Sequence, residues 1–202
     1  MKALIIIDIQ NDFCPGGSLE VPNGDEIIPV INKIQNSFDL VVATQDWHPA
    51  DHVSFASNHI GKKYYDKIDL FGEKQILWPD HCVQNSCGAQ IHSGLDQKKI
   101  EAIFRKGMDP YIDSYSGFFD NGHKKKTGIA GYLRDKGVSM LFFCGLASDI
   151  CVYYSIRDAL DLNFSSVLIE DASKPLDSKN FYRIKDELIK RGVEIVKSNN
   201  IL

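Results

Sequence analysis

The chain has 202 residues, of which 44% are hydrophobic and 25% are charged, a composition typical of a globular protein. A chain of this length can bury about 70% of the surface that its unfolded form exposes, so it needs no disulfides to stabilise a core. The formal net charge of −4 argues against a general nucleic-acid binder, because such proteins are normally basic. The run Lys124-Lys125-Lys126 is too short to change this and is more typical of a solvated loop.

Neither a membrane segment nor a secretion signal is expected. No stretch approaches the roughly 20 apolar residues of a membrane helix. The first apolar run, residues 3–7, ends at Asp8 and lacks the length and the cleavage site of a signal peptide. The five cysteines are an odd number and form no CxxC pair, which favours separate reduced thiols over a disulfide framework. We therefore expect a cytoplasmic protein with neither a membrane nor a nucleic-acid partner.

The first hundred residues begin as an alternation of strand and helix patterns. A strand is expected at residues 3–8, apolar on both faces like a central parallel strand. A helix is expected over about residues 24–38, where isoleucines recur at helical spacing, and a second strand at residues 40–43. Residues 47–100 depart from the alternation, since they are rich in His, Trp, Asp, Gly and Pro and only weakly periodic. Such a segment is usually functional or disordered, and its aromatic side chains argue against disorder.

The alternation resumes after residue 100. Strands are expected at residues 102–104, 140–144, 166–169 and 193–196, and helices at 128–136, 149–161 and 179–191. This order predicts an α/β fold, a doubly wound and mostly parallel six-stranded sheet with helices on both faces. We expect a single domain over residues 1–202, with an irregular insertion at about residues 47–100 that binds metal and substrate.

Polar residues follow several of these strands, at the edge where an open α/β sheet binds its ligands. Asp8 ends the first strand, Asp46 follows the second and Lys106 follows the third. Residues 145–151 connect the fourth strand to its helix. Because the carboxyl ends of parallel strands meet at one edge, we expect these four points to converge.

Cys151 is a candidate nucleophile at this edge. Ser148 or Asp149 is expected to cap the helix after the fourth strand, which places Cys151 in the first turn. There the helix dipole and the free N–H groups stabilise a thiolate or an oxyanion. A lone cysteine is more often a small buried hydrophobe, so the functional interpretation depends on convergence. Asp8 would then accept the thiol proton, and Lys106 would stabilise the charged pair.

Histidines are concentrated in the irregular segment, where four of the six lie between residues 48 and 81. Asp46 and His48 are two residues apart, and His52 and His81 follow. One carboxylate with two or three imidazoles suits Zn²⁺, Fe²⁺ or Mn²⁺. An Asp-x-His spacing is common by chance, so the concentration of histidines is the stronger signal.

Six motifs occur in order between residues 8 and 152. They are residues 8–13 (Asp-Ile-Gln-Asn-Asp-Phe), 44–49 (Thr-Gln-Asp-Trp-His-Pro), 78–83 (Trp-Pro-Asp-His-Cys-Val), 106–107 (Lys-Gly), 113–118 (Asp-Ser-Tyr-Ser-Gly-Phe) and 145–152 (Gly-Leu-Ala-Ser-Asp-Ile-Cys-Val). Each alone is a modest signal, and together they are highly specific. In this set and order the chain resembles the nicotinamidase/pyrazinamidase group of the isochorismatase-like cysteine hydrolases.

The resemblance implies a catalytic group and an oxyanion hole. The family's catalytic triad falls on Asp8, Lys106 and Cys151. A cis peptide of the family falls on Leu146–Ala147, and the N–H groups of Ala147 and Cys151 would form the oxyanion hole.

The resemblance also implies a metal site and a slot for an aromatic ring. The metal ligands fall on Asp46, His48 and His81, with His52 as a weaker ligand or a residue beside the metal. One divalent transition metal is implied, Zn²⁺ first, with Fe²⁺ and Mn²⁺ as alternatives. The ring slot falls on Phe13, Trp78 and Tyr115. Two segments match no family pattern. We expect residues 59–75 to influence substrate access, and residues 171–176 to shape either the mouth of the pocket or an oligomer contact.

The activity that the resemblance implies is hydrolysis of nicotinamide, a small-molecule substrate, to nicotinate and ammonia, a step of NAD salvage. The route is a thioester on Cys151, and pyrazinamide is an expected further substrate. One alternative is a carbamoyl or ureido amidohydrolase of the same superfamily, which would not need the metal group. Another is a non-catalytic metal-binding or thiol-sensing module. A vinyl-ether hydrolase is disfavoured by Cys151, and the oligomeric state stays open between a monomer and a homo-oligomer.

Overall fold

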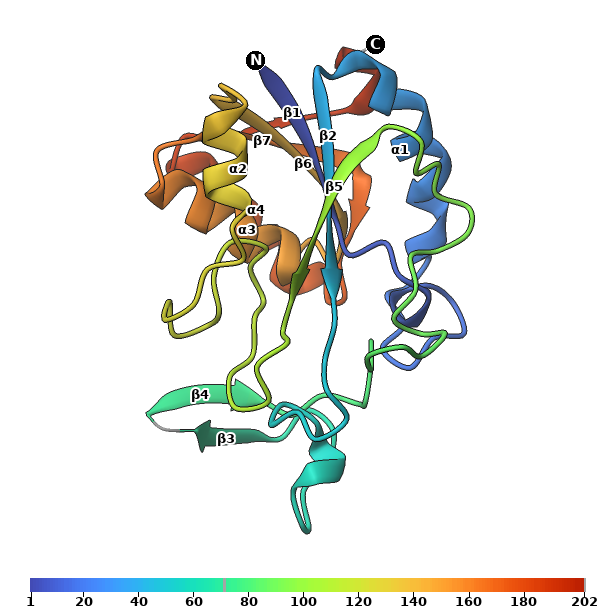
Figure 1. Cartoon of the computed structure of the whole chain (residues 1–202), viewed down its shortest axis with the longest axis vertical. Helices are drawn as coiled ribbons and strands as arrows, with labels where there is room; N and C mark the ends of the chain where they lie inside the picture. Colours follow the sequence, from blue (N-terminus) through green and yellow to red (C-terminus); the bar gives the residue numbers. More distant parts are fainter. Residues whose placement is uncertain (71, 202) are drawn as a thin grey trace.

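The central sheet has the predicted architecture. The computed structural model describes residues 1–70 and 72–201, and within them six strands form one sheet in the order β5-β2-β1-β6-β7-β8 (Figure 1). These strands are β1 (Lys2–Ile7), β2 (Leu40–Asp46), β5 (Ile100–Lys106), β6 (Met140–Leu146), β7 (Ser165–Lys174) and β8 (Glu194–Val196). Every neighbouring pair is parallel, so the doubly wound α/β prediction is confirmed.

Helices cover both faces of this sheet, as predicted. On one face lies α1 (Ile28–Ile34), and on the other lie α2 (Ile129–Asp135), α3 (Cys151–Asp161) and α4 (Ser178–Lys190). Side chains alternate between the two faces along a strand. Leu4 and Ile6 of β1 therefore join the core with α1, whereas Ile5 and Ile7 join the core with the other helices. Among the described residues, no helix is both long and apolar enough to cross a membrane.

The predicted helix over residues 24–38 is interrupted. Short 3₁₀ turns, Gly24–Ile27 and Gln35–Ser37, lie on either side of α1, and Pro29 lies in its first turn. Proline has no N–H and clashes with a preceding helical turn, so an α-helix begins near it and does not run through it. The isoleucine spacing therefore predicted the buried face correctly but not the start of the helix. Three further 3₁₀ turns span Asn11–Phe13, Ala56–Asn58 and Ser198–Asn200.

The segment 47–100 contains more regular structure than predicted. Strand β3 (Lys67–Leu70) pairs antiparallel with β4 (Glu73–Ile76) in a separate two-stranded sheet. Figure 1 shows this hairpin beyond the carboxyl ends of β2 and β5. The prediction of an irregular segment is wrong here. Residues 67–70 do alternate polar and apolar side chains, but four residues are the shortest run that such an alternation can mark.

Strand β7 is longer than the predicted strand at residues 166–169. The pairing of β6 with β7 shifts register between Phe143 and Gly145, and Gly145 then pairs with Ser173. The strand thus includes the first part of the segment 171–176, and it leads the chain to Leu176 beside the cavity described below.

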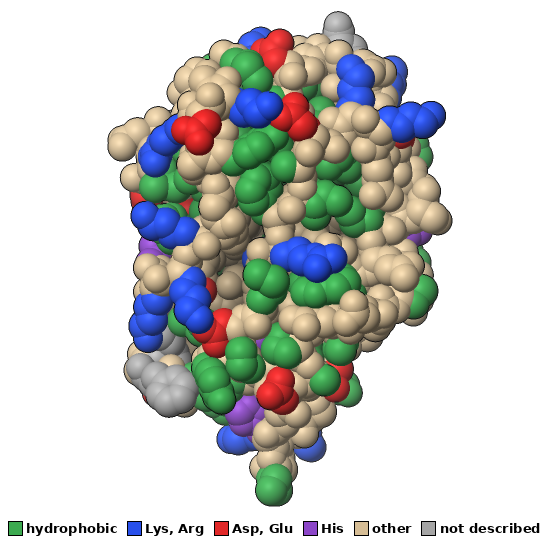
Figure 2. Space-filling view, viewed as in Figure 1, with side chains coloured by type: hydrophobic (Ala, Val, Ile, Leu, Met, Phe, Trp, Pro, Cys, Tyr) green, Lys and Arg blue, Asp and Glu red, His purple; other side chains and the backbone are tan. Residues whose placement is uncertain are grey.

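Charges are dispersed on the face of the molecule shown in Figure 2. Basic side chains there are interrupted by acidic and apolar ones, and the described residues of this face form no continuous basic patch. This distribution agrees with the small negative net charge of the chain.

Candidate active site

Three predicted catalytic side chains meet beyond the carboxyl ends of the strands. Asp8 follows β1, Lys106 ends β5 and Cys151 begins α3, and all three are buried. The Lys106 Nζ lies 3.0 Å from Asp8 Oδ2 and 3.7 Å from Cys151 Sγ. The lysine is therefore the shared neighbour of the carboxylate and the thiol, and the predicted convergence is present.

Hydrogen bonds hold Asp8 and Lys106 in place. Thr44 on β2 donates its hydroxyl to Asp8 Oδ1 at 2.6 Å. Lys106 donates to the Ser114 carbonyl oxygen at 2.9 Å and to Asp46 Oδ1 at 3.0 Å. Its third N–H faces Cys151 Sγ at 3.7 Å, whereas Asp8 Oδ2 is an ion-pair partner at 3.0 Å that accepts no hydrogen bond from the described residues. Asp46 connects this group to the histidines described below.

Burial dominates the electrostatics of the three side chains. Burial raises the pKa of the Cys151 thiol well above its usual value, although Lys106 opposes this. Burial also raises the pKa of Asp8, again against Lys106. Burial by itself would lower the pKa of Lys106, but Asp46 and Asp8 outweigh it and raise that pKa well above the ordinary value. Burial thus favours the neutral thiol of Cys151, while the two neighbouring carboxyl groups favour the charged form of Lys106.

The turn from β6 to α3 positions Cys151. Gly145 has a φ of +119°, and a Cβ there would lie 2.1 Å from the Ile7 carbonyl oxygen, so glycine is required. The next peptide, Leu146–Ala147, is cis, as the family resemblance implies.

The prediction that Ser148 or Asp149 caps α3 is wrong. The residue before the helix is Ile150, and among the described residues no side chain caps it. Asp149 instead accepts hydrogen bonds from the N–H groups of Leu176 and Asp177, at 2.8 and 3.0 Å. It thereby connects the end of β7 to the turn that carries Cys151. The cap prediction failed because this partner lies 27 residues away in sequence.

The backbone amides of Ala147 and Cys151 have no acceptor among the described residues. In the same turn, the N–H groups of Ile150 and Val152 do have an acceptor: both donate to the Ala147 carbonyl oxygen, at 3.0 and 3.2 Å. An oxyanion hole needs N–H donors that are not already used. The oxyanion role of these two amides stays a prediction, and both donors are free for it.

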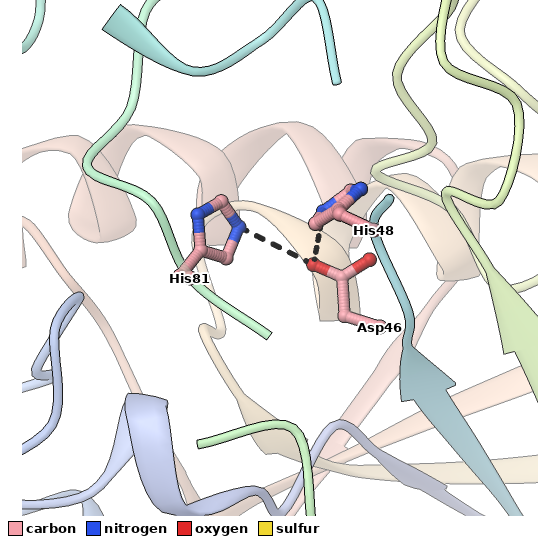
Figure 3. A group of neighbouring side chains, drawn as sticks. All are labelled: Asp46, His48 and His81. Carbon is pink, nitrogen blue, oxygen red and sulfur yellow. Dashed lines mark ion pairs between the residues drawn. The ribbon is translucent and has the colours of Figure 1, made fainter. Parts of the chain in front are cut away.

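Asp46, His48 and His81 form a buried group at the same edge of the sheet (Figure 3). Asp46 ends β2 and His48 follows it, whereas His81 lies in the loop after β4. Asp46 Oδ2 lies 3.0 Å from His48 Nε2 and 3.4 Å from His81 Nε2. Figure 3 shows both imidazole rings directed at one carboxylate oxygen.

The residues of this group fit a metal ion. The Nδ1 of His48 lies 2.9 Å from the Gly107 carbonyl oxygen, and that of His81 lies 2.7 Å from the Pro79 carbonyl oxygen. A carbonyl only accepts, so these contacts place a proton on each Nδ1 and leave each Nε2 as an acceptor facing Asp46. Within the described residues, His48 Nε2 is buried without a hydrogen-bond partner. One carboxylate and two imidazoles within 4.8 Å suit a divalent transition metal.

His52 lies beside this group. Its ring centroid is 4.2 Å from that of His48, and its Nδ1 is 2.7 Å from Ser54 Oγ. Burial, with a smaller effect of His48, lowers the pKa of His52 to about 4, so the ring is neutral near pH 7. The side chains close enough to bind one metal ion together with His52 are His48 and Asp113, and Asp46 is not among them. Whether His52 binds the metal or only lies beside it stays a prediction.

A small cavity opens beside Cys151. The three aromatic side chains predicted to hold a ring all line it: Phe13, Trp78 and Tyr115. Leu176 lines it too, in the segment 171–176 that we expected either at the mouth of the pocket or at an oligomer contact. Further lining residues were not predicted from the sequence, among them Leu19, Val21 and Asp113. They lie in loops, where no periodicity marks them, and only the position of Asp113 at the start of a family motif offered a signal.

Gly107 brings the backbone unusually close to the metal group. A Cβ at this position would lie 2.3 Å from His48 Cε1 and 3.0 Å from Asp46 Oδ1. Its φ of +67° is also one that other residues rarely adopt. Glycine therefore allows the carbonyl at this position to accept the hydrogen bond that orients His48.

We expect Gly107→Ala to displace the His48 ring and to lower metal affinity about 10–100-fold, the usual effect of losing a contact that orients a ligand. Titration of metal into metal-free protein against a competing chelator measures this. The matched control is Gly131→Ala in α2, where an added methyl group meets nothing within 4 Å. Equal metal affinity in the two variants would contradict the expectation.

A parallel sheet with its polar cluster at the carboxyl edge defines an α/β enzyme of the doubly wound class. Residues 2–199 match the family described as the isochorismatase domain. The nicotinamidase of Acinetobacter baylyi is 44% identical over 201 residues, which cover 99% of this chain and 94% of that protein. The chain belongs to the isochorismatase family.

Two solved structures are similar over nearly their whole length. The nicotinamidase/pyrazinamidase of Acinetobacter baumanii has a TM-score of 0.97 at 40% identity, covering 100% of this chain and 98% of that one. The pyrazinamidase of Pyrococcus horikoshii in complex with zinc has a TM-score of 0.81 at 36% identity, covering 97% and 98%. The family expected from the sequence motifs is thus confirmed.

Proposed function

We propose that this protein is an amidohydrolase that converts nicotinamide to nicotinate and ammonia, and that also accepts pyrazinamide. One observation carries the proposal. The buried thiol of Cys151 lies beside the Lys106–Asp8 pair, in a cavity lined by aromatic rings and by Asp46 and His81. The substrate is supported by the three similar proteins named above, which are nicotinamidases or pyrazinamidases.

The first half of the proposed reaction forms a thioester. The pyridine ring occupies the slot between Phe13, Trp78 and Tyr115. Cys151 Sγ attacks the carboxamide carbon while Asp8 accepts the thiol proton. The N–H groups of Ala147 and Cys151 stabilise the oxyanion, by about 3 kcal/mol each. Asp8 then gives its proton to the amide nitrogen, the C–N bond breaks and ammonia leaves.

The second half releases the acid. Water attacks the thioester carbon and Asp8 accepts a proton from it. The C–S bond breaks, the sulfur regains the proton from Asp8, and nicotinate leaves. Lys106 stays charged throughout, because it neutralises Asp8 and Asp46 in a buried site. The sum of the two halves is one amide and one water converted to one acid and one ammonia.

Asp46, His48 and His81 would hold one divalent transition metal in this proposal. Zn²⁺ is favoured because the similar pyrazinamidase of Pyrococcus horikoshii was solved with zinc, and Fe²⁺ and Mn²⁺ suit the same donors. When bound, the ion would attract the ring nitrogen and so orient the carboxamide toward Cys151.

Ammonia release from nicotinamide, before and after chelation and with each ion added back, tests the proposal. We expect chelation to lower the rate at least about tenfold and one ion to restore it. No release with any ion would refute the substrate, and carbamoyl and ureido compounds would be tested next. Bound metal without hydrolysis of any amide would instead support a non-catalytic module.

The domain organisation, the cellular location and the oligomeric state are further proposals. We propose a single domain over residues 1–202, in which the segment 47–100 contributes metal and substrate contacts. Cytoplasmic location is supported by the five cysteines, which are all free. A homo-oligomer is a separate expectation, which light scattering of the purified protein tests.

A further inference from the structure

Gln75 of β4 connects the β3–β4 hairpin to the candidate active site. It is 5% exposed. Its side-chain Nε2 lies 2.9 Å from Asp113 Oδ2, 3.2 Å from the Tyr115 hydroxyl oxygen and 2.7 Å from the Ile76 carbonyl oxygen. Among the described residues of the hairpin, it is the one side chain that hydrogen-bonds to residues 113–115.

Residues 113–115 lie between Gln75 and the catalytic group. All three line the cavity beside Cys151. The Ser114 carbonyl oxygen accepts a hydrogen bond from Lys106 at 2.9 Å. Asp113 accepts the N–H of Ser114 on its other oxygen, at 2.8 Å. The segment is therefore fixed by Lys106 on one side and by Gln75 on the other.

We propose that Gln75 is a positioning residue for the reaction: it fixes Tyr115 and Asp113 so that the aromatic slot keeps the shape that seats the substrate ring. This inference rests on the proposed function. Gln75 does not itself line the cavity, so it acts through its two partners. Its two N–H groups are shared among these three acceptors, of which the half-buried Tyr115 hydroxyl is the farthest. Without the amide, the buried Asp113 carboxylate and the Tyr115 hydroxyl lose this shared donor, which allows Tyr115 to leave its position.

Steady-state kinetics of two variants test this role. Gln75→Leu keeps the approximate size and removes the donor, and we expect KM for nicotinamide to rise about tenfold with kcat changed less than about threefold. Gln75→Glu keeps the shape but adds a carboxylate beside Asp113, and we expect a larger rise in KM. Lys190→Ala, at an exposed position of α4 outside the segment 47–100, is the control with unchanged KM.

Two further measurements separate positioning from a general loss of structure. In Gln75→Leu/Tyr115→Phe we expect a smaller fall in kcat/KM than the product of the two single effects, because the variants remove the same contact. Hydrogen exchange without substrate is expected to become faster in residues 107–121 of Gln75→Leu, with β1 and β6 unchanged.

Unchanged KM together with unchanged exchange in residues 107–121 would overturn the inference. Independent effects of the two substitutions would also overturn it, as would faster exchange that extends to β1 and β6. If the wild-type protein releases no ammonia, the proposed function fails by itself. The exchange measurement then still decides whether Gln75 orders residues 113–115.

Discussion

Replacement of Cys151 by alanine is expected to lower the rate of ammonia release from nicotinamide by at least about 10⁴-fold. The variant loses the sulfur that forms the thioester, whereas Asp8 and Lys106 keep their contact at 3.0 Å. Metal content is expected to stay at the wild-type level, because Cys151 is not part of the Asp46 group. Initial rates, bound metal and Tm are measured on the same preparation.

Cys144→Ala is the matched control for this prediction. Cys144 is buried in β6, where its Sγ lies 3.8 Å from the Ile5 carbonyl oxygen, and it does not line the cavity. We expect a small loss of stability and wild-type turnover. Normal turnover by Cys151→Ala would refute the thioester, and an equal loss in both variants would attribute the effect to folding rather than to chemistry.

Lys106→Met is expected to destabilise the protein by about 3–5 kcal/mol, the usual effect of removing one partner of a buried ion pair. The substitution leaves the carboxylates of Asp8 and Asp46 buried without the cation that lies 3.0 Å from each. For a chain of about 200 residues this corresponds to a fall in Tm of about 10 °C. Turnover is expected to be lost as well, and thermal melts with ammonia assays measure both effects.

The double variant Asp8→Asn/Lys106→Met tests whether the stability lost in Lys106→Met can be recovered. Removing one of the two uncompensated charges is expected to recover about 1–3 kcal/mol of stability without recovering activity. In Lys106→Met, losing the cation raises the pKa of Asp8 further and leaves the pKa of Asp46 less strongly lowered, so the ionised form of Asp8 opposes folding at neutral pH. The stability deficit is therefore expected to shrink as pH falls from about 8 to about 5. Additive effects and a deficit independent of pH would contradict the ion-pair explanation.

The pattern of apolar and polar residues along the chain was sufficient to predict the central parallel sheet. Strands such as β1 are apolar on both faces because each face meets a helix layer, and that double burial appears in the sequence as an uninterrupted run. The carboxyl ends of parallel strands share one edge, so Asp8, Asp46 and Lys106 could be expected together before any distance was known. The Lys106 Nζ lies 3.0 Å from a carboxylate oxygen of Asp8 and 3.0 Å from one of Asp46, which confirms this expectation.

Contacts among loops could not be predicted in this way. From its position in the sequence, Asp149 is expected to cap a helix, but its carboxylate accepts hydrogen bonds from the N–H groups of Leu176 and Asp177 after β7. The strands of the β3–β4 hairpin have four residues each, so the alternation of polar and apolar residues in β3 is too short to stand out. Such features depend on which loops pack against each other, and no local pattern encodes that.

The sequence by itself therefore determined the fold class, the family and the kinds of side chain at the carboxyl edge, because hydrophobic period and motif chemistry are local properties. The tertiary structure alone decided how these side chains serve one another. It placed Lys106 between two carboxylates, left the amides of Ala147 and Cys151 without acceptors among the described residues, and brought Gln75 to Tyr115 from 40 residues away. The physical reason is that hydrogen bonds and charges in a buried site act over a few ångströms of space, whatever the distance along the chain.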